Sequence, residues 1–298
     1  MSPLRRGPDI SIGIIGTENT HVDHIIQYLN VERNHPGVRV VALAGGTTER
    51  NRALAEIGGI EIIVNDVSDL VGQADAFFVG HRDGALHADH AVPLLQTGHP
   101  VMVEKPLACG VADARKIIDA ALAGNAPLTS YSPLRFLPEA DALENALGTI
   151  GPLRSLSVGG PADPTSEYGG IFFYGIHPVD IALRLAHGAI GDVRLERAAE
   201  SLVASVVVGD AVVTFTFVLP QNGRRIPFHA LAVGSQGVHT VPEFDLAGNY
   251  VAPGLEAFLG MVESGSIPIP YKELLRPIEL LSAIARAAES LGIVPLPR

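Results

Sequence analysis

A chain of 298 residues has room for two domains, each large enough to bury a core of its own, which excludes a single small module. Hydrophobic residues make up 47% of the chain and charged residues 18%, a composition too apolar for a disordered protein. The net charge is -11 and the basic residues are scattered along the sequence, which argues against nucleic acid as a partner.

No apolar stretch approaches the roughly 18 residues that a membrane span requires, and the segment with Arg5 and Arg6 lacks the apolar core of a signal peptide. We therefore expect a cytoplasmic protein with no membrane partner. Cys109 is the only cysteine, so it can form neither an internal disulfide nor a thiolate metal site. We expect it to be a small buried hydrophobic residue.

The first part of the chain alternates short apolar runs with helical patterns, an order typical of a parallel sheet built from βαβ units. Five strands are predicted as nearly continuous apolar runs, as expected for strands covered on both faces. They span Ile10 to Gly16, Val38 to Ala44, Ile62 to Val64, Ala76 to Val79 and Val101 to Glu104. Helices with glycines after their ends are predicted at Glu49 to Ile57, Leu86 to Gln96 and Ala112 to Ala123.

A further strand, Leu128 to Tyr131, leads out of this doubly wound sheet. We place a domain boundary near residue 128, so that residues 1–128 form a dinucleotide-binding domain. Residues 129–298 are then expected to form an α/β domain for substrate binding and oligomerisation.

The second domain is predicted to contain one large, mostly antiparallel sheet. A helix follows Pro138, then a strand near Leu153 to Val158, a loop from Gly159 to Gly170 and a helix from Pro178. Short connections then join four strands, as in an antiparallel meander. These strands span Leu202 to Val208, Ala211 to Leu219, Ile226 to Val233 and Gly237 to Val241. Two helices, near Gly254 to Glu263 and Glu273 to Leu291, close the chain.

A doubly wound sheet binds its ligand at the carboxyl ends of its strands, so the loops there are the candidate site. The loop after the first strand keeps only one glycine of a GxGxxG fingerprint, because Glu18 and His21 occupy the other two positions. A carboxylate about 5 Å from a phosphate costs on the order of 3 kcal/mol unless it turns away or is neutralised. The residues that can still bind a cofactor anion are Gly16, Thr17, Asn19 and Thr20. Alternatively, the loop is a polar turn in which Asn19 or Thr20 caps the helix.

After the second strand, the acidic residue that usually binds the ribose hydroxyls is missing, because Gly45 stands there. Thr47 and Arg50 leave room for a 2′-phosphate, so this loop is as compatible with NADP as with NAD. Arg50 is alternatively a solvated helix residue, and Thr47 can cap the helix.

Lys105 ends the fifth strand within the sequence Glu104-Lys105-Pro106. A partly desolvated lysine has a lowered pKa and can exchange a proton with a substrate hydroxyl. The alternative is a surface pair of Glu104 with Lys105. His81, after the fourth strand, and Glu104 lie at the same edge of the sheet, and we assign both to cofactor binding.

The segment from Gly169 to Asp180 is the last candidate. Pro178 suits the first turn of a helix, which makes His177 the N-cap residue, and the helix dipole there would favour a neutral imidazole. A buried cap histidine and a capping role for Asp180 are the alternatives. Tyr174 can reach a ligand or belong to the core. The other histidines form no recognisable zinc pattern, so no metal is expected.

These motifs resemble the Gfo/Idh/MocA oxidoreductase family, the group of glucose-fructose oxidoreductase and inositol dehydrogenases. The resemblance rests on Glu104-Lys105-Pro106, on Gly169 to Asp180, on Tyr131 to Phe136 with Arg135, and on Phe258 to Leu296. It implies a Rossmann domain, an open-faced C-terminal domain that often mediates dimers or tetramers, NAD(P), and redox chemistry on sugars or cyclitols.

The resemblance also implies roles for single residues. Lys105 and His177 would handle the hydroxyl proton, and Tyr174, Arg135 and Asp180 would bind substrate. The family's usual aspartate, four residues before the histidine, is Phe173 here.

Two functions therefore remain open. The first is an NAD(P)-dependent oxidoreductase acting on a small sugar, cyclitol or related substrate, with Lys105 and His177 in proton transfer. The second is a divergent member without dehydrogenase turnover, acting as a non-redox lyase or isomerase or as a binding or assembly subunit. In either case we expect a homodimer or homotetramer that associates through the C-terminal sheet.

Overall fold

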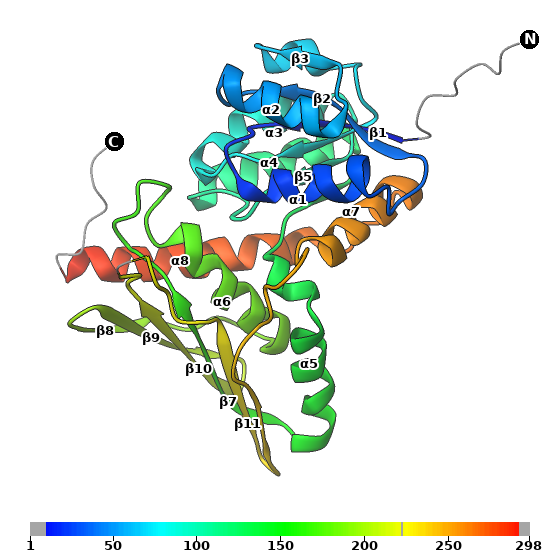
Figure 1. Cartoon of the computed structure of the whole chain (residues 1–298). Helices are drawn as coiled ribbons and strands as arrows, with labels where there is room; N and C mark the ends of the chain where they lie inside the picture. The colour runs from blue at the N-terminus through cyan, green and yellow to red at the C-terminus, as the bar shows by residue number, and fades with distance from the viewer. Residues whose placement is uncertain (1–9, 222, 292–298) are drawn as a thin grey trace, which may run out of the picture.

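The computed structural model describes residues 10–221 and 223–291, which form two six-stranded sheets with helices packed on them (Figure 1). The predictions made for residues 1–9, and for the last residues of the stretch ending at Leu296, lie outside the described residues. Within the described part, no helix has the length and apolarity to cross a membrane. The division into two domains near residue 128 stays a prediction.

The first sheet is fully parallel, with strand order β3-β2-β1-β4-β5-β6. Its strands are β1 (Ile10–Ile15), β2 (Val38–Ala44), β3 (Ile62–Val64), β4 (Ala76–Val79), β5 (Val101–Val103) and β6 (Leu128–Thr129). The predicted doubly wound sheet is therefore confirmed, with strand ends that differ by at most two residues. The order reverses between β1 and β4, where such a sheet opens a crevice at the carboxyl ends of its strands.

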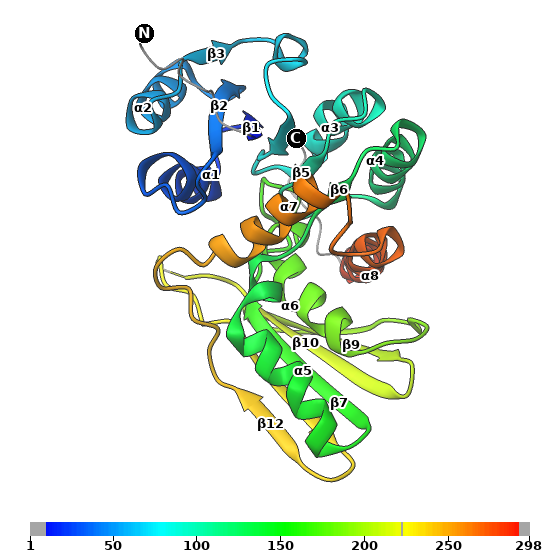
Figure 2. The ribbon, with the colours of Figure 1, turned by 90° about the vertical axis from the view of Figure 1, so that its right-hand side faces the viewer.

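Helices cover both faces of this sheet, as the apolar strands required. Figure 2 shows α1 (Thr20–Ile26) and α2 (Thr48–Gly58) on one side and α3 (His87–Gln96) and α4 (Val111–Gly124) on the other. Asn19 caps α1 by accepting from the His21 amide, and Thr47 caps α2 by accepting from the Arg50 amide. Cys109 is half-buried against the core rather than fully buried.

The second sheet has the order β12-β11-β7-β10-β9-β8, so the predicted simple meander is wrong. Its strands are β7 (Leu153–Pro161), β8 (Arg194–Ala198), β9 (Ser201–Val208), β10 (Ala211–Val218), β11 (His229–Gly234) and β12 (Val238–Val241). β7 lies between β10 and β11 and runs parallel to β10, while the other neighbours are antiparallel. β7 also continues to Pro161, into the predicted loop. The edge strand β8 was missed because its charged, exposed residues show no apolar pattern.

Helix α6 (Phe172–Leu185) begins six residues earlier than predicted, after Gly169 and Gly170 at positive φ. Apolar side chains at helical spacing, among them Phe172 and Ile176, extend its buried face toward the N-terminus. Pro178 therefore lies inside the helix, where it removes one backbone hydrogen bond. His177 is not an N-cap residue, and the helix-dipole argument for its neutral form is wrong.

One face of the second sheet is covered and the other is open (Figure 1). The covering helices are α5 (Pro138–Ile150), α6 and α8 (Tyr271–Ser290). α8 also packs on α4, and α7 (Ala252–Ser264) lies against α1, so both link the two halves. Apolar side chains exposed on the sheet strands are Val207, Val212, Leu231 and Val238.

Candidate active site

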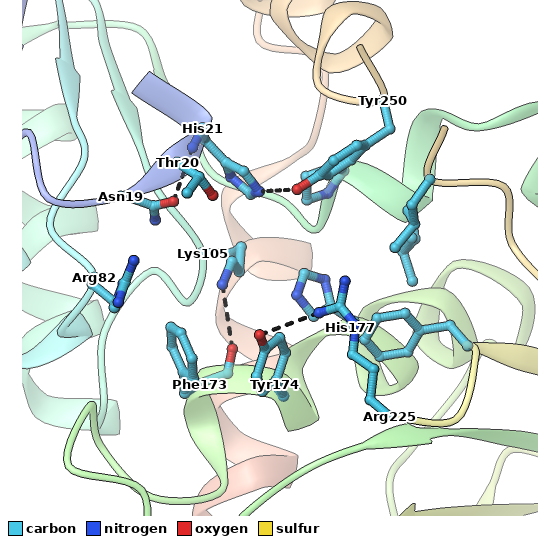
Figure 3. Close-up of a pocket in the computed structure, with 14 residues that line it drawn as sticks. Asn19, Thr20, His21, Arg82, Lys105, Phe173, Tyr174, His177, Arg225 and Tyr250 are labelled. Atoms are coloured by element: carbon cyan, nitrogen blue, oxygen red, sulfur yellow. Dashed lines mark hydrogen bonds between the residues drawn. The ribbon is translucent and has the colours of Figure 1, made fainter. Parts of the chain in front are cut away.

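A cavity of about 260 Å³ lies at the carboxyl edge of the first sheet, where that edge faces α6 and the second sheet (Figure 3). The start of α1, the loops after β4 and β5, and α6 each contribute to its wall. Its lining residues are Asn19, Thr20, His21, Arg82, Lys105, Pro133, Leu134, Phe173, Tyr174, His177, Arg225, Phe228, Leu246 and Tyr250. The topology thus gathers polar side chains from distant parts of the chain around one small space.

Lys105 reaches the cavity from the end of β5 and is only 4% exposed. Its ammonium donates to the Phe173 carbonyl at 3.3 Å and lies 4.6 Å from the centre of the Phe173 ring. Burial lowers the pKa of Lys105 below its ordinary value, against the opposing effect of the Glu104 carboxylate. The alternative of a surface pair with Glu104 is therefore wrong, and the amine is suited to exchange a proton with a bound hydroxyl.

Glu104 points away from the cavity and connects Lys105 to His21. Its Oε1 lies 2.8 Å from Nδ1 of His21 and 3.7 Å from the Lys105 ammonium. Burial would raise the pKa of Glu104, but His21 and Lys105 outweigh it and hold the pKa below its ordinary value. Glu104 is 2% exposed and does not line the cavity, and its contact with a cofactor stays a prediction. Its carboxylate is instead the charge that orients the two cavity residues.

His177 lies beside Lys105 in the cavity wall, and its Nδ1 is 2.7 Å from the Ser132 hydroxyl. Burial and the nearby Lys105 ammonium hold the pKa of His177 well below its ordinary value. The neutral imidazole that was expected from a helix dipole thus arises from burial. It can hydrogen-bond a substrate hydroxyl or accept its proton.

Arg135 and Asp180 bind each other instead of facing the cavity. The Arg135 guanidinium is 2.8 Å from Oδ1 of Asp180, whose Oδ2 accepts from the Ser132 amide at 2.9 Å. Neither residue lines this cavity, and their substrate contacts stay a prediction. Asp180 also lies in the interior of α6, which excludes a capping role. The pair instead holds Ser132 next to His177.

Tyr174 does line the cavity, as predicted, and its hydroxyl accepts from Arg225 at 3.2 Å (Figure 3). The sequence patterns missed Arg225, Phe228 and Tyr250, because these residues come from loops after and between the strands of the second sheet. Arg82 was also missed, although its place directly after β4 could have identified it.

The loop between β1 and α1 keeps one glycine for a steric reason. Gly16 has φ +81°, and a Cβ there would lie 2.6 Å from the His81 ring. Thr17 is fully buried and donates to Asn51 at 2.6 Å, so its hydroxyl is not available to a cofactor as predicted. Asn19 and Thr20 line the cavity at the N-terminus of α1, where backbone amides favour an anion.

Glu18, at the position of the second fingerprint glycine, accepts hydrogen bonds from its neighbours. Its Oε1 accepts from Nδ1 of His81 at 2.9 Å and from the Arg82 amide at 3.2 Å. Burial would raise the pKa of Glu18, but these bonds lower it to about 2. The His81 side chain therefore binds Glu18 and does not line the cavity, and its contact with a cofactor stays a prediction.

Arg50 is likewise committed within the protein. Its guanidinium binds both carboxylate oxygens of Asp23 and donates from Nε to the Thr17 carbonyl at 2.9 Å. The contact of Arg50 with a 2′-phosphate stays a prediction. Thr47 serves as the cap of α2.

A second cavity of about 260 Å³ lies nearby, at the ends of β2 and β3. Its lining contains Arg52 but no carboxylate, and it comprises Gly45, Gly46, Thr48, Asn51, Arg52, Ile63, Val64 and Asn65. Two cavities along one strand edge, the first with the α1 N-terminus and Arg82, fit the two ends of a dinucleotide. Among residues 10–221 and 223–291, no group of three or more His, Cys, Asp or Glu side chains is arranged to hold a metal ion.

Comparison with known proteins matches residues 10–131 to the family described as "Oxidoreductase family, NAD-binding Rossmann fold". The chain is similar to inositol 2-dehydrogenase 1 of Saccharopolyspora erythraea, with 32% identity over 148 residues that cover 48% of this chain and 43% of the relative. It is also similar to D-apiose dehydrogenase of Paraburkholderia graminis, with 31% identity over 200 residues that cover 63% of this chain and 52% of the relative. The matched part thus spans about half the length of these relatives.

The fold extends further than the sequence similarity. The structure of myo-inositol dehydrogenase from Lactobacillus casei in complex with NAD(H) and myo-inositol superposes with a TM-score of 0.78 and covers 94% of both chains. Sequence identity in that superposition is 18%, so it establishes the shared fold of both sheets alone.

Proposed function

Because the chain belongs to the Gfo/Idh/MocA oxidoreductase family through its N-terminal Rossmann fold, we propose that it is an NAD(P)-dependent oxidoreductase of a sugar, cyclitol or related polyol. The observation that carries this proposal is the buried amine of Lys105, which faces a cavity at the carboxyl edge of the dinucleotide-binding sheet. The relatives named as inositol and apiose dehydrogenases support the substrate class.

The residues around the first cavity suit proton transfer at a hydroxyl-bearing carbon. A bound nicotinamide would supply the acceptance or donation of a hydride. Lys105 takes the hydroxyl proton on Nζ during oxidation, because its lowered pKa makes the neutral amine accessible. His177, neutral and fixed by Ser132, hydrogen-bonds the same or the adjacent hydroxyl.

The cavity wall also suits a polyol in shape and polarity. Tyr174, Arg225 and Tyr250 offer hydrogen bonds, while Phe228 and Leu246 provide an apolar surface for the carbon face of a ring. Asn19, Thr20 and Arg82 would hold the cofactor phosphates, with the charge of Glu18 offset by His81. The carboxylate-free cavity with Arg52 would hold the ribose end, whether it carries a 2′-hydroxyl or a 2′-phosphate.

We further propose that the protein forms a homodimer or homotetramer through the open face of its second sheet. Val207 and Val212 are paired across β9 and β10 and are 51% and 48% exposed. Leu231 and Val238 are exposed on the same face of β11 and β12, on the other side of β7. A second copy of the chain would remove this surface from water. Light scattering on the wild type and on Val212→Lys tests it, with the variant expected as a monomer.

The alternative is a member without redox turnover, and the carboxylate of Glu18 at the second glycine position is the observation that favours it. One experiment separates the two. The purified protein is denatured and its supernatant is assayed for NAD(H) and NADP(H) by mass spectrometry, and both cofactors are then titrated into the apoprotein. Micromolar binding, followed by cofactor reduction with a polyol from a screened panel, is expected. No binding at millimolar cofactor would overturn the oxidoreductase proposal.

A further inference from the structure

Tyr250 lies in the cavity wall (Figure 3), and its hydroxyl belongs to a line of three side chains in contact, Tyr250, His21 and Glu104. The Tyr250 oxygen is 3.1 Å from Nε2 of His21, and Nδ1 of His21 is 2.8 Å from Oε1 of Glu104. Tyr250 precedes α7, His21 is in the first turn of α1 and Glu104 follows β5. Three segments far apart in sequence therefore meet at one side of the cavity.

The line has a defined direction of donation. The pKa of Glu104 lies below its ordinary value, so the group is an ionised carboxylate that only accepts hydrogen bonds. Nδ1 of His21 is 2.8 Å from this carboxylate, so a His21 ring with its proton on Nδ1 leaves Nε2 to accept from the Tyr250 hydroxyl. The remaining lone pairs of the Tyr250 oxygen are then available to a hydroxyl group bound in the cavity.

We propose that Tyr250 is a second proton-transfer residue of this cavity and that His21 and Glu104 are the positioning residues that activate it. The inference rests on the proposed oxidoreductase function and adds to it a residue outside the motifs with Lys105 and His177. The arrangement of acceptor, imidazole and hydroxyl follows the logic by which a carboxylate and a histidine activate a hydroxyl group in other enzymes.

The proton movement balances within the line. In each turnover the substrate hydroxyl gives its one proton either to Nζ of Lys105 or, by this second route, to the Tyr250 oxygen. In the second route the original phenolic O–H bond breaks and an N–H bond forms at Nε2 of His21. The resulting imidazolium is held by the Glu104 carboxylate. The hydride from the same carbon is accepted by the nicotinamide dinucleotide, so the line itself neither gains nor loses electrons.

Glu104 couples this line to Lys105, because the same Oε1 lies 2.8 Å from His21 and 3.7 Å from the Lys105 ammonium. The charged and titratable groups that face Tyr250 and His21 are Glu104, Lys105, His24, Tyr174, His177 and Arg225. Burial raises the pKa of Tyr250, which keeps the phenol protonated between turnovers.

The Tyr250 hydroxyl is not needed to attach its segment to α1. Asn249 donates to the His24 carbonyl at 3.1 Å, and the Tyr28 hydroxyl donates to Glu256 of α7 at 2.9 Å. Tyr28 is thus a matched control, since it joins the helical turn after α1 (Gln27–Val31) to α7 by a phenolic hydrogen bond outside the cavity.

The test compares Tyr250→Phe and His21→Gln with Tyr28→Phe in steady-state oxidation of a polyol over a range of pH. We expect Tyr250→Phe to lower kcat about a hundredfold with KM changed less than about threefold, as for loss of a proton-transfer group. Tyr250→Phe and His21→Gln should both lose the same limb of the profile of kcat against pH, while Tyr28→Phe should keep it. A profile of unchanged shape in Tyr250→Phe would overturn the proposal, since a structural role would alter the melting temperature or KM only.

A second readout does not depend on turnover. In protein with ¹⁵N-labelled histidine, the His21 ring, assigned by its loss in His21→Gln, should show the Nδ1–H tautomer, and its Nε2 signal should move in Tyr250→Phe. An Nε2–H tautomer, or an Nε2 signal that Tyr250→Phe leaves in place, would overturn the proposal. If the wild type oxidises no polyol, the proposed function fails, and this spectrum still decides whether the line exists.

Discussion

Two parts of the same sheet edge use their polar side chains in opposite ways. At the ends of β1 and β2, the polar groups satisfy one another, as in the pairs Arg50 with Asp23 and Glu18 with His81. At the end of β5, Lys105 is more deeply buried than either pair and faces a cavity. Polar groups that bind each other stabilise the loops, whereas a buried group that faces a cavity is available for chemistry.

Removal of the buried amine of Lys105 should have the largest effect on turnover. Lys105→Met should lower turnover by about a thousandfold, since loss of a proton-transfer group typically costs 10²- to 10⁴-fold. The variant should still fold, because Glu104 keeps its closer partner His21 and methionine replaces the hydrocarbon part of the side chain. Turnover and thermal unfolding measure the two effects.

Lys116→Met is the matched control for this variant. Lys116 is an exposed lysine of α4 that pairs with Asp113 at 2.7 Å, far from the cavity lining. Its loss should change turnover less than twofold. Equal effects of the two lysine variants would mean that the position of Lys105 is irrelevant to the reaction.

The packed part of the edge is probed by Gly16→Ala. The new Cβ would require a left-handed backbone at φ +81° and would lie 2.6 Å from the His81 ring. Strain and overpacking together should lower the free energy of unfolding by about 3 kcal/mol. Gly59→Ala, at φ +61° with nothing within 4 Å, should cost only about 1 kcal/mol. Chemical denaturation of both variants measures the difference, and equal losses would contradict the steric argument.

The two arginines of α2 should affect different properties, since Arg52 should act on cofactor affinity and Arg50 on the stability of the fold. Arg52 lines the cavity at the ends of β2 and β3, so Arg52→Gln should weaken NADP binding about tenfold relative to NAD, or about 1.4 kcal/mol. Arg50 is bound to Asp23, so Arg50→Gln should leave that ratio unchanged and lower the unfolding free energy by about 1 kcal/mol or less. Calorimetric titration with both cofactors measures the ratio of the NADP and NAD affinities. A larger change of this ratio in Arg50→Gln than in Arg52→Gln would show that Arg50, and not Arg52, recognises the 2′-phosphate.

Glu18 should give the smallest effect, a pH-dependent contribution to stability. Its pKa is about 2 in the folded protein, below the ordinary 4.5, so the carboxylate stabilises the fold above pH 4.5. That contribution is lost as the pH falls from 4.5 toward 2. The difference in Tm between the wild type and Glu18→Gln should therefore be largest near neutral pH and narrow over this interval. A constant difference would show that the pair with His81 does not lower the pKa.

Much of the fold could be predicted from the sequence, because β1 to β5 are continuous apolar runs bounded by glycines and caps. The second sheet was harder, since the position of β7 between β10 and β11 depends on contacts between residues far apart in sequence. The start of α6 was misplaced because Pro178 is common in a first helical turn, while tertiary packing of Phe172 and Ile176 outweighed that preference.

The site could be predicted where function follows directly from a strand end. Lys105 and His177 do line one cavity, and Tyr174 lies beside them. Residue type alone could not show that Arg50 is bound by Asp23, because that depends on how α1 and α2 pack against each other. Nor could it show that His21, at the last position of a degenerate glycine fingerprint, would meet a tyrosine more than 200 residues away.

The most direct test of the central claim is a crystal structure of the protein with NADP or NAD and a polyol. The account predicts the adenosine end beside Arg52 and the nicotinamide ring in the cavity of Lys105 and His177, with a substrate hydroxyl within hydrogen-bond distance of the Lys105 amine. A dinucleotide bound with its nicotinamide away from Lys105, or none bound at saturating concentration, would contradict it.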